Sequence, residues 1–493
     1  MTPNPIPESM PSVGISGKEH TTESHQLERR VSWKSAAIIS MGGSILVAVS
    51  LAAMAADLGS ASIFVWTLTA LIGVANCLMI CEMAGMFPHK SGGGAVYAHE
   101  AFKTKSPFPG AIAAWGYWLG WIPVIPVNLV LIAGYLKGTL MPNASVPIVA
   151  VVLALALYGA NYFGLKPGVW MSVAMAVFAM GPLLVIALSP IYRAHLFSWA
   201  NILPFVPLKG SWTSGASWLL MIKWAFIAAW SSYAFESAST VVAELKDPHR
   251  DAPKAMVAAS IVGMFAYGIV PLVMLGIVGV ETLSKDPSIA FLPAAAAIFG
   301  KTGASVVVIM LVAALLLGAQ TAIIGSSRTV YEMSKDGTMI KQFGHLNPFG
   351  VPDRGMVWDC LITLLLLVVF KDNVINMVGA STVGYMMVWM ILPIAYILLR
   401  RDPSHANRPF KLPAIFIPLA AVFAVFNAIL LFVGGFQWGG FTPTGPFVLG
   451  FLIMFTFVPF YLIRRAQNRS KVVAPMFSSS PVLDMDDDLA EAI

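Results

Sequence analysis

The sequence predicts an all-α integral membrane protein of about twelve transmembrane helices, and two observations lead to that prediction. Hydrophobic residues make up 58% of the 493 residues and charged residues only 11%, whereas soluble chains carry about 25% charged residues. The apolar residues also occur in blocks of about 20, the length that crosses a bilayer as an α-helix. Because so few charges cannot cover a water-exposed surface, lipid must be the solvent of this chain.

The apolar blocks, taken in chain order, place the individual helices. We expect them at about residues 33–56, 63–86, 108–136, 146–164, 168–189, 216–244, 254–279, 303–326, 355–370, 373–398, 412–434 and 444–463. The residues before position 33 are polar and contain no apolar core, so they are not typical of a cleaved signal peptide. We therefore expect polar tails at 1–32 and 464–493.

Most lysines and arginines in the predicted loops fall on one side of the membrane. It is the side on which the N-terminus lies. Because Lys and Arg resist translocation, we expect this side to be the cytoplasm. The distribution predicts a protein of the plasma (inner) membrane with both termini in the cytoplasm. It also accounts for the net charge of +6, so we expect no nucleic-acid partner.

The sequence lacks the common motifs of membrane enzymes. It contains no HExxH, no GxSxG and no His or Cys cluster at metal-ligand spacing. Cys77, Cys81 and Cys360 all lie in predicted helices at membrane depth, where no external disulfide framework is available. We therefore expect neither enzyme activity nor a metal or cofactor.

The first predicted helix contains a break near the middle of the membrane. Gly42, Gly43 and Ser44 lie about 15 Å along the helix from Trp33, counted at 1.5 Å per residue. A Gly-Gly-Ser step has low helix propensity and frees backbone N–H groups, which only protein or a water-filled cavity can satisfy at that depth. The alternative is close helix packing through small residues.

The sixth predicted helix contains a second break. It is longer than a straight span requires, and Trp230, Ser231, Ser232 and Tyr233 interrupt its aliphatic run. Glu236 follows, and a carboxylate at membrane depth usually faces a polar cavity or a partner. The alternative for Glu236 is a structural hydrogen bond inside the helix bundle.

The positions of the two breaks indicate a repeat. Helices 1 and 6 each begin a set of five, which is the arrangement of an inverted repeat with its binding site at the broken helices. The first repeat would span residues 33–189 and the second 216–398, giving a ten-helix core at 33–398. Two additional helices would follow at 412–463.

Four segments match a known family in the correct order. They are MGGSIL in helix 1, EMAGMFPHKSGGGAVYAHEAF after helix 2, WSSYAFESASTVVAELKDPHRDAPKA in helix 6 and SSRTVYEMSKDGTMIKQFGHLNPFGVP after helix 8. With them the chain, over about residues 33–460, resembles the amino acid permeases of the amino acid, polyamine and organocation transporter superfamily. The resemblance implies a LeuT-like fold of five plus five inverted helices with two extra helices, and alternating access around a central site.

The resemblance and the physics of helix ends together imply roles for the broken helices. Freed N–H groups near Gly42, Gly43 and Ser44 would bind a substrate carboxylate at the positive end of a half-helix. The carbonyl end of the outer half of helix 6, around Ala229 to Ser231, would accept an ammonium group. The side-chain pocket or gate would include Trp230, Tyr233 and Phe235, and the opposite wall Gly120 and Trp121 of helix 3.

Glu236 stands where many relatives that resemble basic amino acid and polyamine exchangers are acidic. The resemblance implies that it couples proton occupancy to gating or meets a cationic substrate. Departures from the family limit the substrate further. Residues 318–325 lack the aromatic that some arginine exchangers use, helix 5 has no mid-membrane Lys, and residues 138–145 have no Cys. We therefore expect no disulfide-linked heavy chain.

The leading interpretation is a secondary carrier of amino acids or related amines, either proton-coupled or exchanging one substrate for another. An alternative is a transporter-like amino acid sensor that binds the same ligand without flux, although the sequence contains no long signalling domain to favour it. A channel is disfavoured because no charged ring or pore loop is visible. The expected partners are a small-molecule substrate, protons and the lipid bilayer.

Overall fold

The computed structural model describes residue 29 and residues 31–41, 46–90, 92–164, 169–285, 289–405 and 408–477. Regular structure within these residues is helical, apart from one isolated parallel bridge between Val31 and Leu245. The prediction of an all-α fold is confirmed.

The first five predicted helices all contain helical structure. The third is divided in two, and a short helix that the sequence did not predict precedes it. The described parts of the first are two helices, one on each side of residues 42–45. The observed helices are α1 (Trp33–Met41), α2 (Val47–Leu58), α3 (Ala61–Met86), α4 (Gly94–Phe102), α5 (Phe108–Trp121), α6 (Val124–Thr139), α7 (Val146–Tyr162) and α8 (Val169–Tyr192).

The remaining predicted helices are also helical in the structure. They are α9 (Gly215–Ser232) with the 3₁₀ helix η4 (Ala234–Glu244), α10 (Pro248–Lys285), α11 (Phe291–Lys335), α12 (Asp353–Phe370), α13 (Val374–Arg401), α14 (Phe416–Ile429), α15 (Pro446–Phe455) and α16 (Phe457–Phe477). A short π-helix, η8 (Leu430–Gly434), continues α14.

Length and hydropathy identify fewer membrane-crossing helices in the structure than the sequence predicts. Within the described chain, eight helices are long and apolar enough to cross a membrane, and nine if the bent pair Met180–Tyr192 and Ala194–Asn201 forms one span. Val146–Tyr162 is apolar but shorter. The chain is a multi-pass membrane protein, and the count of twelve stays a prediction.

Helical structure extends beyond the predicted limits between α10 and α11. We predicted a loop from residue 280 to 302, but α10 continues past Gly279 and α11 begins at Phe291. Gly279 and Gly300 both have φ of 69°, a left-handed conformation that residues with a Cβ adopt only at a cost. The chain therefore turns sharply at these two glycines while remaining helical on either side.

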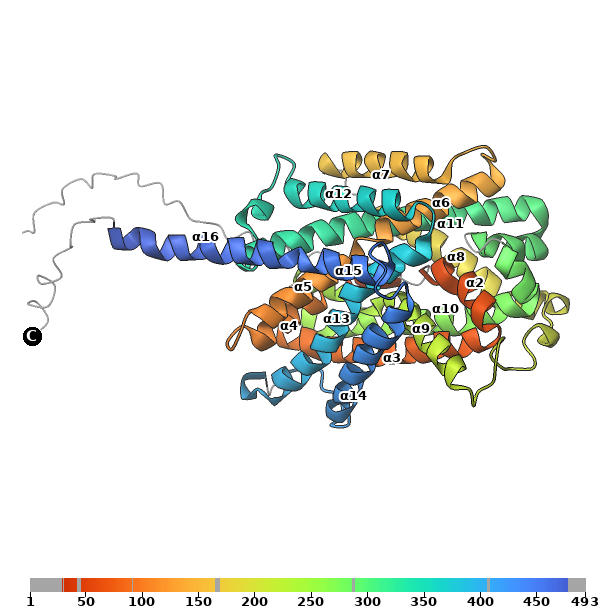
Figure 1. Cartoon of the computed structure of the whole chain (residues 1–493), viewed down its shortest axis with the longest axis horizontal. Coiled ribbons are helices and arrows are strands. Elements are labelled where there is room, and N and C mark those ends of the chain that lie inside the picture. The colour runs from red at the N-terminus through yellow and green to blue at the C-terminus, as the bar shows by residue number, and fades with distance from the viewer. Residues whose placement is uncertain are drawn as a thin grey trace, which may run out of the picture.

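The helix contacts show the five-plus-five repeat. Equivalent helices pack on each other, since α3 contacts α10, α6 contacts α11, and α7 contacts α12, the last pair lying side by side in Figure 1. The other contacts also come in matched pairs. In one pair, α10 packs on α1 and α2, and its counterpart α3 packs on α9 and η4. In the other pair, α5 packs on α13, and correspondingly α11 packs on α8. With the five crossings predicted for each half, an odd number, equivalent helices would run in opposite directions, as an inverted repeat requires.

Burial separates the central helices from those that face lipid. The segment formed by α5 and α6 is the most enclosed, with 89% of its most apolar window buried. In contrast, Val422 and Val425 on α14 and Leu452 on α15 are more than half exposed, as expected where lipid covers apolar side chains. Helix α16 extends away from the body of the bundle (Figure 1). The residue limits of the two repeats and of the tails stay predictions.

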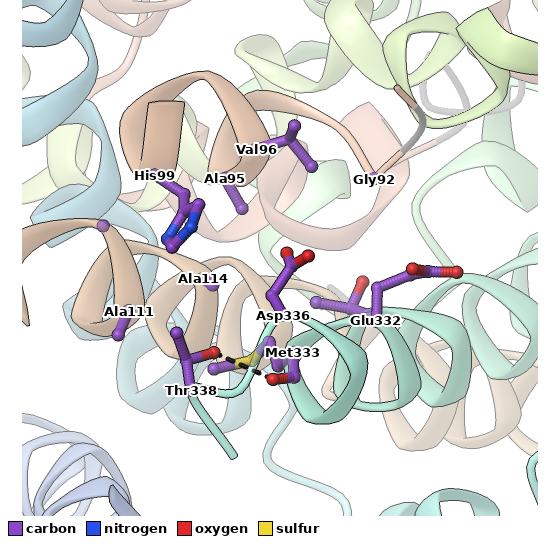
Figure 2. A pocket seen from close by; sticks show the side chains of 12 residues that line it. Gly92, Ala95, Val96, His99, Ala111, Ala114, Glu332, Met333, Asp336 and Thr338 are labelled. Carbon is purple, nitrogen blue, oxygen red and sulfur yellow. Dashed lines mark hydrogen bonds between the residues drawn. The ribbon is translucent and has the colours of Figure 1, made fainter. Parts of the chain in front are cut away.

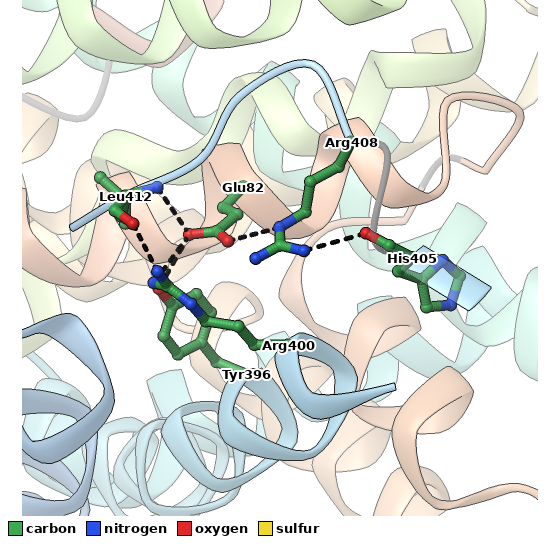
Figure 3. A network of polar contacts seen from close by, with 6 residues as sticks. All are labelled: Glu82, Tyr396, Arg400, His405, Arg408 and Leu412. Atoms are coloured by element: carbon green, nitrogen blue, oxygen red, sulfur yellow. Dashed lines mark hydrogen bonds and ion pairs between the residues drawn. The ribbon is translucent and has the colours of Figure 1, made fainter. Parts of the chain in front are cut away.

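A buried carboxylate ties the end of α3 to the connection after α13. Glu82 is fully buried and accepts hydrogen bonds from the Tyr396 hydroxyl at 2.8 Å and the Leu412 backbone N–H at 3.0 Å. It also pairs with Arg408 Nε at 2.5 Å and Arg400 Nη1 at 3.3 Å (Figure 3). Glu82 is therefore held in an ion-paired arrangement between α3 and the chain that follows α13.

Candidate functional site

The α-helix of the sixth segment ends at the aromatic and serine cluster. The N–H of Tyr233 donates to the carbonyl oxygen of Ala229 at 3.1 Å, and beyond this point the chain continues as a 3₁₀ helix. Side-chain hydroxyls support the tighter winding, because Ser237 Oγ donates to Ala234 O at 2.9 Å and Thr240 Oγ1 donates to Ser237 O at 2.6 Å. Ser and Thr compete for backbone groups in this way and weaken a regular α-helix. The helix is therefore discontinuous where the sequence indicates a break.

Neighbouring helices press closely on this discontinuity. A Cβ at Gly73 of α3 would overlap the carbonyl oxygen of Ser232, and a Cβ at Gly263 of α10 would overlap the ring of Phe235. Only glycine allows these approaches. The discontinuity between α9 and η4 is thus enclosed by α3 and α10.

Glu236 lies in the first turn of η4 and is fully buried. Tyr117 of α5 donates its hydroxyl to Oε1 at 3.0 Å, and Ser239 donates its hydroxyl to Oε2 at 2.7 Å. No basic side chain among the described residues forms an ion pair with this carboxyl group. A buried carboxylate with only neutral donors is costly, so the site favours a proton or an incoming cation.

Trp230 connects α9 to α5. Its indole Nε1–H donates to the carbonyl oxygen of Gly120 at 2.8 Å, and the Ser381 hydroxyl of α13 donates to the same oxygen at 3.0 Å. A Cβ at Gly120 would meet the ring of Tyr385 at 2.5 Å. Trp121, next along α5, is partly exposed. These contacts bring Gly120 and Trp230 together.

The other aromatic residues of the sixth segment point to different helices. The hydroxyl of Tyr233 donates to Asn427 Oδ1 on α14 at 3.1 Å, and its ring lies edge-on to Trp389 at 5.2 Å. The ring of Phe235 lies 5.7 Å from that of Tyr267 on α10. Tyr233 thus contacts α13 and α14, whereas Phe235 contacts α10.

The predicted carbonyl acceptors already have partners within the protein. Ala229 O accepts from the N–H of Tyr233, and Ser231 O accepts from the hydroxyl of Tyr267 at 3.1 Å. A carbonyl oxygen has two lone pairs, so each retains capacity for a further donor. An ammonium group would therefore share these oxygens with Tyr233 and Tyr267.

The end of α1 meets the break in the sixth helix. Gly42, Gly43 and Ser44 lie outside the described residues. Ser40, just before them on α1, accepts hydrogen bonds at Oγ from the N–H of Ala238 at 2.5 Å and from Ser237 Oγ at 3.3 Å. The end of α1 therefore lies directly on η4, beside Glu236.

A concave region lies away from these residues, between α4, the start of α5 and the end of α11 (Figure 2). His99, Glu332 and Asp336 line it, and Thr338 Oγ1 donates to Met333 O at 3.0 Å. The described residues contain no group of three or more His, Cys, Asp or Glu side chains placed to hold a metal ion. None of the residues predicted for the substrate site lines this region.

Comparison with known proteins places the chain in a family. The family model described as amino acid permease matches residues 31–465. The chain belongs to the amino acid permease family. This permease is 23% identical to the D-serine/D-alanine/glycine transporter of Escherichia coli over 68% of its own length and 74% of that protein. It is 24% identical to the glutamate/serine transporter AimA of Bacillus subtilis over 91% of its length and 84% of that protein.

The fold of the permease is also found in a solved structure. The crystal structure of the Eremococcus coleocola manganese transporter in complex with an aromatic bis-isothiourea substituted compound superposes with a TM-score of 0.56. The sequence identity is 13%, and the match covers 90% of the permease and 98% of that chain. At this identity the similarity concerns the fold alone.

Sequence reasoning missed two groups of buried polar residues in the permease. The partners of Glu236 include Tyr117, which is 119 residues away along the chain, and no local pattern indicates that pairing. Asp359 was also missed, although a usable signal existed. It is an acidic residue within the predicted helix at 355–370, and the rule that singled out Glu236 applies equally to it.

Proposed function

We propose that this permease is a secondary active transporter that moves amino acids or related amines across the plasma (inner) membrane by alternating access. Its transport is coupled to protons or to exchange, and both termini are cytoplasmic. The family supports the substrate class, because the two relatives carry amino acid names. The fold supports the mechanism, because the inverted repeat gives two related halves that can rock around a shared site.

The substrate site in this proposal lies between the breaks of helices 1 and 6. The N–H groups near Gly42, Gly43 and Ser44 bind the substrate carboxylate, and the carbonyl oxygens around Ala229 to Ser231 accept its ammonium group. The contact of Ser40 with Ala238 supports this pairing, because it brings the end of α1 onto η4. Trp230, Tyr233 and Phe235, with Gly120 and Trp121 opposite, form the remaining walls.

The observation that carries the proposal is the environment of Glu236. The carboxyl group is fully buried beside the helix break and has two neutral donors, Tyr117 and Ser239, and no basic partner among the described residues. A proton or a cationic substrate that neutralises this charge lowers the cost of burying it, and loss of that cation restores the cost. Occupancy of the site therefore changes the relative free energies of the states in which Glu236 is enclosed and exposed.

The test is uptake into proteoliposomes that contain the purified permease. A panel of labelled amino acids and polyamines is offered to empty vesicles, to vesicles preloaded with the same compounds, and under a pH gradient. Uptake into empty vesicles indicates symport or uniport, whereas uptake only after preloading indicates exchange. Saturable binding without flux in any condition would favour the sensor and overturn the proposal.

The role of Glu236 is tested by Glu236→Gln, with Glu281→Gln as the matched control. Glu281 is an exposed carboxylate near the end of α10, so its change leaves the site intact. We expect Glu236→Gln to lower uptake and flatten its dependence on pH, because the amide can no longer gain or lose a proton. An unchanged rate and pH profile in Glu236→Gln would refute the role of this carboxyl group.

A further inference from the structure

Helix α12 contains another buried carboxyl group, which, like Glu236, has no ion-pair partner among the described residues. Asp359 is fully buried. The indole Nε1–H of Trp118 on α5 donates to Oδ1 at 2.8 Å, and the hydroxyl of Ser326 on α11 donates to Oδ2 at 2.6 Å. Three helices thus meet at one carboxyl group, and its hydrogen-bond partners in the described chain include none of the proposed substrate residues.

No cation neutralises Asp359 in the described part of the chain. The titratable groups near it in the described chain are the hydroxyl of Tyr158 on α7 and the thiol of Cys360 next to it. Three basic side chains of the neighbouring elements have other partners: Lys341 of η6 (Lys341–Gly344) bonds Gln467, Arg328 of α11 pairs with Glu244, and Arg400 of α13 pairs with Glu82. The remaining ones on α11, α12 and α13 are exposed, namely Lys301, Lys335, Arg354 and Arg401. An ionised Asp359 would therefore be an uncompensated charge at membrane depth, which is rare outside functional sites.

The surroundings of Asp359 can satisfy both of its protonation states. When the carboxyl is ionised, the Ser326 hydroxyl donates to Oδ2. When Oδ2 carries a proton, it donates to Ser326 Oγ, and the hydroxyl turns to the carbonyl oxygen of Ile323, at 3.4 Å. Trp118 donates to Oδ1 in both states. A single hydroxyl rotation thus exchanges one hydrogen-bonded arrangement for the other, without leaving a buried polar group unpaired.

Helix α5 lies between this carboxyl group and the substrate site. Tyr117 donates to Glu236 and the next residue, Trp118, donates to Asp359. Adjacent residues on a helix point about 100° apart, so one short stretch of α5 contacts both carboxyl groups. A change in the charge of either group acts on the same turn of helix.

We propose that Asp359 is a proton-binding site of the permease, separate from the substrate site, that is protonated and deprotonated during the transport cycle. The proton comes from water as the carboxylate becomes a carboxylic acid, and it returns to water on the other side of the membrane. The contribution to flux rests on the transport function proposed above. Proton binding itself can be measured without any substrate.

The first experiment measures protonation directly by pH-difference infrared spectroscopy of the full-length permease in lipid bilayers. The carbonyl stretch of a protonated, buried carboxyl group is the signal. The variants are Asp359→Asn and Ser326→Ala, with Asp372→Asn as the matched control, because Asp372 is exposed in the connection between α12 and α13. We expect a pH-dependent band that Asp359→Asn abolishes, Ser326→Ala shifts in frequency and Asp372→Asn leaves unchanged.

The infrared band tests the proposal even if Asp359→Asn does not fold. If Asp359→Asn cannot be purified in folded form, the Ser326→Ala shift still assigns the band, because Ser326 contacts Asp359 and only one other oxygen. Absence of a pH-dependent band in the unmodified permease would overturn the proposal. A band that neither variant alters would also overturn it.

The second experiment measures the contribution of Asp359 to proton-driven accumulation. Proteoliposomes are held at zero membrane potential with a gradient of one pH unit, which supplies about 1.4 kcal/mol per proton and hence about a tenfold accumulation ratio. We expect Asp359→Asn to lower the ratio by about tenfold, while exchange at equal pH continues. An undiminished ratio would overturn coupling through Asp359. If the unmodified permease has no flux at all, the proposed function fails, and the infrared result still stands on its own.

Discussion

The buried cluster around Glu82 tests what holds α3 to the end of α13 and the chain that follows it. Glu82 is fully buried and receives donors from Tyr396, Arg400, Arg408 and Leu412 (Figure 3). The side chains of Arg400 and Arg408 are only 11% and 8% exposed, so water cannot replace the carboxylate. Removal of Glu82 therefore leaves two nearly buried positive charges without their partner.

We expect Glu82→Ala to destabilise the permease by about 3–5 kcal/mol, the cost of removing one partner from a buried ion pair. Arg408→Ala should cost less, because Glu82 keeps Arg400, Tyr396 and the Leu412 N–H. The double variant should be less destabilised than the sum of the two single variants, because it no longer leaves Arg408 unpaired.

The assay is reversible denaturation in mixed micelles, which gives the free energy of unfolding of each variant in a double-mutant cycle. Lys105→Ala serves as the control, because Lys105 is an exposed residue outside the cluster. Single-variant effects that add to within about 0.5 kcal/mol would show that Glu82 and Arg408 do not interact energetically. A loss below about 1 kcal/mol in Glu82→Ala would place the pair in the class of exposed ion pairs and refute the reasoning from burial.

Two further predictions concern packing and charge. Gly263→Ala should destabilise the permease and reduce uptake, because the added methyl overlaps the ring of Phe235, whereas Gly268→Ala on the same helix has open space; equal melting temperatures for the two variants would contradict this. For Glu100 of α4, burial raises its pKa, but hydrogen bonds from Lys103 and Lys90 outweigh it and hold the pKa below its ordinary value. This group therefore stabilises the fold above its ordinary pKa and loses that contribution as the pH falls through the lowered pKa. Lys103→Met should move that loss to higher pH in melting curves, and an acid profile that matches the Lys105→Met control would contradict it.

The sequence predicted the helices well because hydropathy is a local property. Each apolar block forms a helix in the structure, since lipid requires every backbone polar group to be satisfied within its own segment. The limits were less accurate where helices continue without being apolar. The chain between Gly279 and Gly300, read as a loop, is mostly helical, because turns at glycine can join helices without a polar linker.

The candidate site was predictable only where a residue conflicted with its surroundings. Glu236 was visible in the sequence because a carboxylate interrupts an apolar segment, and the serines beside it indicated the break. Its partner Tyr117 was not visible, because it comes from a helix far away along the chain. For the same reason the contacts of Tyr233 with Asn427 and of Trp230 with Gly120 required the fold.

By itself, the sequence determined that this permease is a membrane-embedded helical bundle with a carboxyl group at a broken helix. Both properties follow from the free energy of transferring individual side chains into lipid, which depends on residue type and position along one segment. Only the tertiary structure decided that Tyr117 and Trp118 join two buried carboxyl groups through adjacent positions on α5. Hydrogen bonds of this kind depend on which helices pack together, and those contacts join segments that are far apart along the chain.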